Sequence, residues 1–351
     1  MFADADRFSV MIHNKMDDFA RIENSGDSNS TNDQDPINQV LEKSKKLSEK
    51  HAKYTKQYKK QQKNLNEHSM SFSSQIALLS PRDWKVIVSQ QESFSRSQYL
   101  QVRYNVINQG APDKHRGKLW IKLLNIEPAM EQHASNLYSK LIEFSNVEVE
   151  KDITKDVDRT LAELHLWRED LQGGNNKLYN VLKAYANYDN EVGYVQGLNY
   201  IVGLLLFYIP DEEQVFWCLY SLMQKRNWRQ VYTFNFPKLK SLTRLLEERL
   251  KQEFPRVLRH LNDNCLEVEG TFSPHFMTLY VYLTPIEIAT RLFELFILDG
   301  EMALVRILLR MIELKQKKIM ALEDVELQKY VLSGIIVECT EQYSIGALLD
   351  L

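Results

Sequence analysis

Residues 178–201 read LYNVLKAYANYDNEVGYVQGLNYI, and an apolar run follows as far as Ile209. Apolar side chains recur at helical spacing before the polar centre of this stretch, and almost every residue after it is apolar, so the pattern predicts two helices joined by a turn. In the turn, Gly193 and Gly197 flank Gln196. Glycine lets another backbone approach closely, and a buried helix would hold the turn rigidly, which suits a recognition loop with an amide at its tip. The same residues also suit a tight helix start without a function.

Apolar residues recur at helical spacing along the whole chain from about Ser80 onward. Segments with a period of 3.6 residues alternate with short breaks, and the whole chain of 351 residues holds only 12 Gly and 9 Pro. We find no sustained alternation of apolar and polar residues, as a strand would show, and no repeat of fixed period. The predicted helices span 97–109, 116–125, 129–145, 153–168, 175–188, 196–208, 212–223, 238–252, 254–263, 274–283, 285–298, 300–315 and 322–339. The predicted fold is therefore all-α, one irregular domain of about 250 residues.

Composition excludes several classes of protein. A net charge of −3 argues against a dedicated nucleic-acid binder. The three cysteines, Cys218, Cys265 and Cys339, form no CxxC pair, which suits free thiols in a reducing compartment. The first ten residues lack the pattern of a signal peptide, and the longest apolar run is shorter than the ~20 residues of a membrane span. We expect a soluble protein of the cytoplasm.

Two N-terminal segments differ from the rest in charge. Residues 1–37 carry eight acidic and three basic residues and end in a polar tract, so we expect a disordered acidic segment with a short amphipathic helix, either marginal or docked on a partner. Residues 38–68 carry nine Lys against three Glu. The segment 38–75 is predicted as a basic helix or linker, which is either a solvated charged helix or an arm that touches an anionic membrane or polymer.

Most motifs of catalysis are absent from the sequence. It contains no GxSxG, HExxH, P-loop or GxGxxG pattern, and its eight histidines are isolated, so no metal site is predicted. A turn that begins at Gly110 leads to Arg116 and Trp120, four residues apart. On a helix this spacing puts a guanidinium against an indole, which indicates a structural role.

Asp156 and Arg159 stand three residues apart in the sequence IleThrLysAspValAspArg that begins at Ile153. On a helix, this spacing lets the carboxylate hold the guanidinium in one rotamer. By spacing alone the pair is an ordinary surface ion pair. An arginine that stabilises charge on another molecule would need such a neighbour, because its guanidinium should be positioned in advance.

Together and in this order, the three motifs resemble those of the TBC-domain family, the GTPase-activating proteins of Rab GTPases. The family pattern of GxP…RGxxW, IxxDxxR and YxQG stands here as Gly110-x-Pro112…Arg116-Gly117-x-x-Trp120, Ile153-x-x-Asp156-x-x-Arg159 and Tyr194-x-Gln196-Gly197. The resemblance covers residues 98–340. It implies an irregular multi-helix domain of two helical lobes, an N-lobe at 98–211 and a C-lobe at 212–340.

The resemblance implies a GTPase activator that works in trans and is not itself an enzyme. Arg159 matches the family's arginine finger, and Gln196 matches its glutamine finger, whose amide positions the attacking water. No cofactor is expected, because GTP and Mg²⁺ belong to the GTP-bound Rab partner. The implied setting is vesicle trafficking and intracellular protein transport, with peripheral contact to endomembranes and no nucleic acid.

The other motif residues receive supporting roles from the same resemblance. Asp156 would orient Arg159. The loop that carries Gln196 would be shaped by Gly193, Tyr194 and Gly197. Arg116 and Trp120 are assigned to the scaffold.

The sequence departs from the family pattern at three places. The arginine motif usually continues as RTFP, whereas this chain has Arg159-Thr-Leu-Ala; a common Trp is replaced around His275, and a later WD pair is replaced by Phe293-Glu294. These replacements concern packing and the edges of motifs.

The sequence is also compatible with two other functions. A non-catalytic adaptor would bind a GTPase without accelerating hydrolysis, but a decayed family member should have lost at least one finger, and both are present. A structural component of a cytoskeletal or ciliary assembly is favoured only by the basic segment 38–68.

Overall fold

The structure is a computed structural model of the chain, and it describes residues 78–90, 92–163, 174–282 and 284–349. Within these ranges, the side chains of Asp158 and Arg159, and those of 161–163 and 174–176, are outside the description. All described residues belong to one compact unit, 58–351. The predicted segments 1–37 and 38–75 lie outside the described residues.

The described residues form helices and turns and contain no strand, which confirms the all-α prediction. The elements are α3 (Pro81–Ser89), α4 (Arg96–Gln109), α5 (Asp113–Leu124), α6 (Glu127–Gln132), α7 (Leu137–Glu143), α8 (Val147–Glu163), α9 (Gly174–Tyr188), α10 (Leu198–Tyr208), α11 (Glu212–Lys225), η2 (Trp228–Val231), α12 (Pro237–Glu253), α13 (Pro255–Asp263), α14 (Val268–Met277), α15 (Ile286–Asp299), α16 (Glu301–Ile319), α17 (Asp324–Lys329), the π-helical turn η3 (Tyr330–Gly334), α18 (Ile335–Gln342) and α19 (Ile345–Leu348). None of the described helices is both long and apolar enough to cross a membrane.

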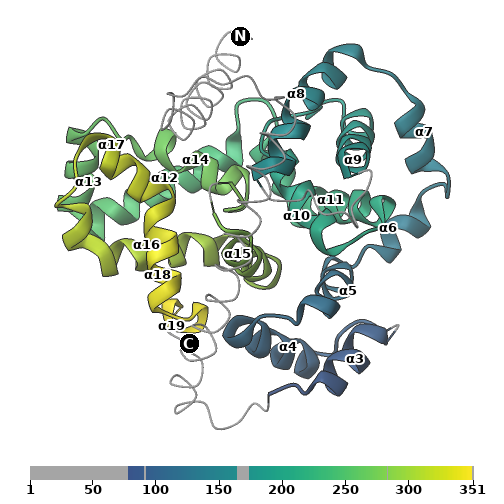
Figure 1. Cartoon of the computed structure of the whole chain (residues 1–351), viewed down its shortest axis with the longest axis horizontal. Coiled ribbons are helices and arrows are strands. Elements are labelled where there is room, and N and C mark those ends of the chain that lie inside the picture. The colour runs from purple at the N-terminus through teal and green to yellow at the C-terminus, as the bar shows by residue number, and fades with distance from the viewer. Residues whose placement is uncertain (1–77, 91, 164–173, 283, 350–351) are drawn as a thin grey trace, which may run out of the picture. The chain divides into compact units, whose positions relative to one another are not determined.

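Helices α6 to α11 gather on one side of Figure 1 and α12 to α18 on the other. In the first group α9 packs against α7, α8, α10 and α11, and in the second α12 packs against α13, α14 and α16. Helix α11, which the resemblance assigns to the start of the C-lobe, packs on α9 and α10 and also on η2, and the lobe boundaries stay a prediction. Helices α4 and α5 both contact α15, so the start of the domain is fastened to its second half.

Helix α10 forms the centre of the first group. It contacts α5, α8, α9 and α11, and every residue from Leu198 to Leu206 is buried. An apolar helix with no polar face is stable only when it is surrounded in this way. It ends just before Pro210, which cannot continue a helix.

Some predicted helix boundaries are wrong. The predicted helix 129–145 is two helices, α6 and α7, because the chain turns at 133–136. The predicted helix 274–283 is instead α14, which runs through Pro274 from Val268. Proline removes the hydrogen bond to the carbonyl four residues earlier and its ring crowds that carbonyl, and burial on both sides of Pro274 offsets these costs.

Three other helices also differ from the sequence prediction. The predicted helix 153–168 begins earlier, at Val147, where the Glu150 carboxylate accepts from the backbone of Asn146. The predicted helix 322–339 is divided by η3 into α17 and α18. Helix α3 was not predicted, although Ser80 and Asp83 form a complete capping box at its start.

Candidate functional site

Gln196 lies in the turn between α9 and α10, and its side chain is half-buried. The helix begins at Leu198, two residues later than predicted, with Gly197 as the N-cap. Gly193 and Gly197 both have positive φ values, +59° and +113°. Such backbone conformations favour glycine, so both glycines shape this turn by their dihedral angles.

The start of this turn is fixed by a buried carboxylate. Asp189 accepts two hydrogen bonds from Arg229 of η2, from Nε at 2.6 Å and Nη2 at 2.8 Å, and a third from the backbone N–H of Val192. Arg229 also binds Glu191 at 2.6 Å. Burial raises the pKa of Asp189, but the hydrogen bonds from Arg229 and Val192 outweigh it, so its pKa lies below the ordinary value. Asp189 is thus a charged anchor at neutral pH.

A side-chain hydrogen bond connects the turn to helix α8. The hydroxyl of Tyr194 donates to Asp156 Oδ2 at 2.7 Å. Asp156 is buried and lies one helical turn before Arg159. Two residues that the sequence predicted as parts of one site, 38 positions apart, are therefore in direct contact.

A second link joins the end of the turn to α8. The backbone N–H of Gly197 donates to Asn199 Oδ1 at 2.7 Å, and Asn199 Nδ2 donates to the Thr160 hydroxyl at 2.7 Å. Thr160 in turn donates to the backbone carbonyl of Asp156 at 2.6 Å. We call these five residues, Tyr194, Asp156, Thr160, Asn199 and Gly197, the loop–helix ring.

Arg159 belongs to α8 and lies between Asp156 and Thr160, both of which are bonded to the turn of Gln196. The guanidinium itself is outside the described side chains, so its orientation by Asp156 stays a prediction. The sequence motifs did not single out Thr160, Asn199 and Arg229 as parts of the site. Asn199 had a visible signal, an amide at the start of an otherwise apolar run.

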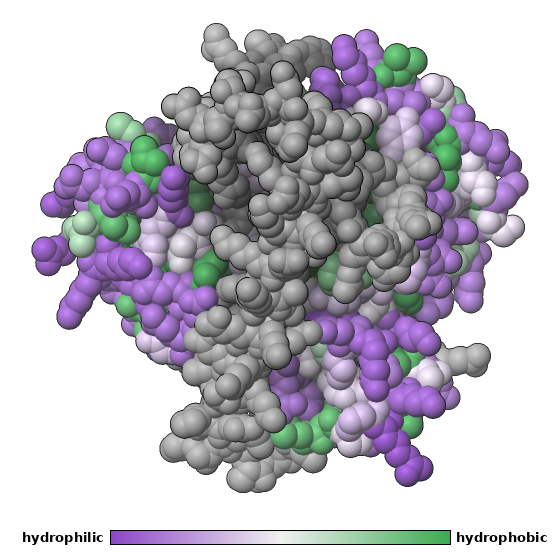
Figure 2. All heavy atoms as spheres, in the orientation of Figure 1, coloured by the Kyte–Doolittle hydropathy of each residue, from purple (hydrophilic) through white to green (hydrophobic). Residues whose placement is uncertain are grey.

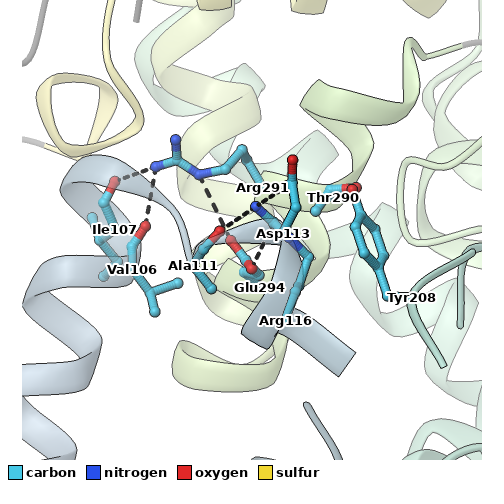
Figure 3. A network of polar contacts seen from close by, with 9 residues as sticks. All are labelled: Val106, Ile107, Ala111, Asp113, Arg116, Tyr208, Thr290, Arg291 and Glu294. Carbon is cyan, nitrogen blue, oxygen red and sulfur yellow. Dashed lines mark hydrogen bonds and ion pairs between the residues drawn. The ribbon is translucent and has the colours of Figure 1, made fainter. Parts of the chain in front are cut away.

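The motif that begins at Gly110 forms a separate polar network, shown in Figure 3. Arg116 donates to Glu294 Oε1 at 2.8 Å and to the carbonyl of Ala111. Arg291 donates to the carbonyls of Val106 and Ile107, and its Nε lies 3.8 Å from Glu294 Oε2. We call Arg116, Arg291 and Glu294 the arginine clamp, which fastens α4 and α5 to α15.

The aromatic contacts of this network correct one prediction. The guanidinium of Arg116 lies over the ring of Tyr208, 5.0 Å from its centroid, rather than against Trp120. Trp120 packs edge-on against Tyr208 and Phe293. A Cβ at Gly117 would lie 2.2 Å from the carbonyl oxygen of Tyr208, so only glycine fits there. The scaffold assignment of Arg116 and Trp120 stays a prediction.

His275 is a buried residue that joins α14 to η3. Its Nε2 lies 2.9 Å from the carbonyl oxygen of Leu332, which accepts from it. Burial lowers the pKa of His275 to about 4, so the ring is neutral at pH 7. In the same helix, Met277 lies against Gly197. Across the described part of the chain, no group of three or more His, Cys, Asp or Glu could hold a metal ion.

An all-α domain that ties a glutamine-bearing turn to an arginine-bearing helix is the architecture expected of a TBC domain. Residues 113–320 match the RabGAP-TBC family, described as the Rab-GTPase-TBC domain. The chain therefore belongs to this family.

Known relatives are similar over the same region. The human Ecotropic viral integration site 5 protein homolog is 28% identical over 289 residues, 81% of this chain and 35% of that protein. The Rab GTPase-activating protein eat-17 of Caenorhabditis elegans is 32% identical over 218 residues, 62% of this chain and 23% of that protein. The chain thus spans 35% and 23% of the lengths of these two relatives.

A solved structure shares the fold. The Chlamydomonas flagellar RabGAP TBC domain matches 78% of this chain and 96% of its own length, with a TM-score of 0.60 and 22% sequence identity.

Proposed function

We propose that this protein is a GTPase-activating protein for a Rab-family GTPase and that it acts in trans through Arg159 and Gln196. Membership of the RabGAP-TBC family and similarity to the Rab GTPase-activating protein eat-17 support the reaction class. The observation that carries the residue assignment is the hydrogen bond from Tyr194 to Asp156, because it ties the turn of Gln196 to the helix of Arg159.

In the proposed reaction, the GTPase supplies GTP, Mg²⁺ and the binding pocket. Transfer of the γ-phosphoryl group to water spreads negative charge over the phosphate oxygens and the leaving group. An arginine delivered in trans neutralises this charge and is worth about 10³–10⁵ in rate, or roughly 4–7 kcal/mol. Arg159 has this role in the proposal, and Asp156, one helical turn earlier, restrains its rotamer.

Gln196 acts on the attacking water. Its amide oxygen accepts a hydrogen bond from that water, and its amide N–H groups can donate to the phosphate or to the partner's backbone. Such a role requires a backbone that holds the amide in a fixed place. The turn of Gln196 is fastened at Asp189, Tyr194 and Gly197, and in the free protein the residue is half-buried with its Nε2 atom buried.

We also propose which form of the Rab is bound and where in the cell the reaction takes place. The GTP-bound form of the Rab is the one bound, since only GTP carries the γ-phosphate that the two fingers address. Rab GTPases act in vesicle trafficking, so we place the protein peripherally on endomembranes during its reaction.

The test is a GTP-hydrolysis screen against a panel of purified Rab GTPases under single-turnover conditions. We expect the wild-type protein to accelerate hydrolysis by at least one Rab about 10³-fold or more. Binding to the GTP form of a Rab without any acceleration would contradict the proposal and identify an adaptor.

A further inference from the structure

Asn199 is an unusual residue for its position. It is 0% exposed, and it lies in the first turn of α10 among buried apolar side chains. A buried amide is costly unless its polar atoms are hydrogen-bonded. Here the oxygen accepts from the backbone of Gly197 and the nitrogen donates to Thr160, both at 2.7 Å. These two partners allow only one orientation of the amide, because the N–H of Gly197 requires an acceptor.

Thr160 is the matching residue on α8. It is also 0% exposed, and its hydroxyl donates within the helix to the carbonyl of Asp156 while it accepts from Asn199. The hydroxyl could satisfy itself within its own helix by the first bond alone. The second bond is therefore an extra connection between two elements, and it fixes the distance between them.

The residues that this connection joins lie next to the two proposed fingers in the sequence. Thr160 directly follows Arg159, and Gly197 directly follows Gln196. Two hydrogen bonds through the amide of Asn199 thus join the residues that follow the two proposed fingers. The bond from Tyr194 to Asp156 closes the loop–helix ring on the other side of Gln196.

We propose that Thr160 and Asn199 are positioning residues: they hold the backbone of Gln196 in register with the turn of α8 that carries Arg159. This inference rests on the proposed function and adds to it two residues that touch neither the nucleotide nor the water. Both fingers must reach one reaction centre together, and a displacement of about 1 Å can lower a rate by about 10²-fold. A ring that joins their backbones keeps their separation constant before the GTPase binds.

The test compares two substitutions at one position. Thr160→Val keeps the shape of the side chain and removes the hydroxyl, whereas Thr160→Ser keeps the hydroxyl. With the full-length protein and its most responsive Rab, we expect Thr160→Val to lower kcat about 10- to 100-fold with KM changed less than about twofold. Thr160→Ser should restore kcat to within about threefold of wild type.

A matched control separates positioning from stability. Thr243 in α12 is also buried, and its hydroxyl also donates to the carbonyl four residues earlier, that of Leu239. Thr243→Val should leave kcat unchanged. If Thr160→Val alone does not fold, Thr160→Ala removes the same hydroxyl, leaves room for a water to pair with the Asn199 amide nitrogen, and keeps the acceptor of the Gly197 N–H in place. It should fold and still lose kcat.

Three results would overturn the inference. A kcat within twofold of wild type in Thr160→Val, or in Thr160→Ala, would show that the connection does not position the fingers. An equal loss in Thr243→Val would show a general effect of stability, and failure of Thr160→Ser to recover would exclude the hydroxyl as the cause. If Gln196→Ala loses activity as expected while Thr160→Val keeps full activity, only this inference is contradicted. If the wild-type protein stimulates no Rab, the proposed function is contradicted.

Discussion

The arginine clamp and the loop–helix ring both join segments that are far apart in the sequence, but they differ in what they leave to solvent. The clamp encloses its charges: the side chains of Arg116, Arg291 and Glu294 are 7%, 7% and 1% exposed. In the loop–helix ring, Asp156 and Thr160 are buried, whereas Gln196, which lies between Tyr194 and Gly197, is only half-buried. A network closed on all sides can only stabilise, whereas one that fixes a partly exposed residue can also act on a partner.

Figure 2 shows the hydropathy of one face of the molecule. On the face shown, polar residues predominate outside the grey atoms, and apolar residues are scattered among them. Isolated exposed apolar side chains are ordinary on a soluble surface.

The largest effect is expected at the arginine finger. Arg159→Ala should lower kcat about 10³-fold or more and leave the melting temperature unchanged. Arg159→Lys should recover little, because an ammonium cannot reproduce the planar fork of a guanidinium. Single-turnover hydrolysis and thermal unfolding of the same samples measure both quantities. Retention of more than about a tenth of wild-type kcat would remove Arg159 from the site.

A substitution in the arginine clamp should lower stability and leave kcat unchanged, the opposite of the result expected at Arg159. Glu294→Ala leaves two buried guanidinium groups without their shared carboxylate, so we expect a loss of about 3–5 kcal/mol in the free energy of unfolding. Below the unfolding transition, kcat should stay near wild type. Asp113→Ala is the control, because Asp113 binds the same Arg116 at 3.2 Å but is 51% exposed, and it should cost less than about 1 kcal/mol. Chemical denaturation measures the free energy of unfolding of both variants. Equal losses in Glu294→Ala and Asp113→Ala would show that burial does not decide how much an ion pair of Arg116 stabilises the fold.

The Asp189–Arg229 pair lies between these two extremes, because it is largely buried and also anchors the turn. Arg229→Gln should cost about 1–3 kcal/mol at pH 7. The pKa of Asp189 is lower in the folded state, so its contribution is present above the unfolded value of about 3.9 and is lost as the pH falls through the folded value. The stability difference between wild type and variant should therefore shrink below pH 4. A constant difference from pH 7 to pH 3 would contradict this account, and Glu191→Gln at the 66% exposed partner should change little.

The smallest effect is expected outside the described residues. Deletion of residues 1–75 should leave the melting temperature and kcat/KM nearly unchanged, because this region shares no apolar periodicity with the domain. Thermal unfolding and hydrolysis assays of the truncated protein measure the effect. A large loss of either quantity would show that the N-terminal region contributes to the domain.

The sequence was sufficient for the fold class and for most helices bounded by proline or glycine, because these residues restrict the backbone locally. It failed at Pro274, where tertiary burial outweighs the local preference, and at 133–136, where a short turn divides two helices. The motif residues of the site were predicted by resemblance. Thr160 and Asn199 were missed because their roles depend on a contact between residues 39 positions apart, which no local pattern records.

The most direct test of the central claim combines Gln196 with the catalytic glutamine of the responsive Rab. If Gln196 positions the water, a Rab whose own glutamine is changed to Ala should still be stimulated by the wild-type protein, and Gln196→Ala should fail on both forms of the Rab. Residues that act on one water are not additive, so single-turnover hydrolysis of all four combinations is needed. Full activity of Gln196→Ala on the wild-type Rab, with loss only on the mutated Rab, would contradict the two-finger account.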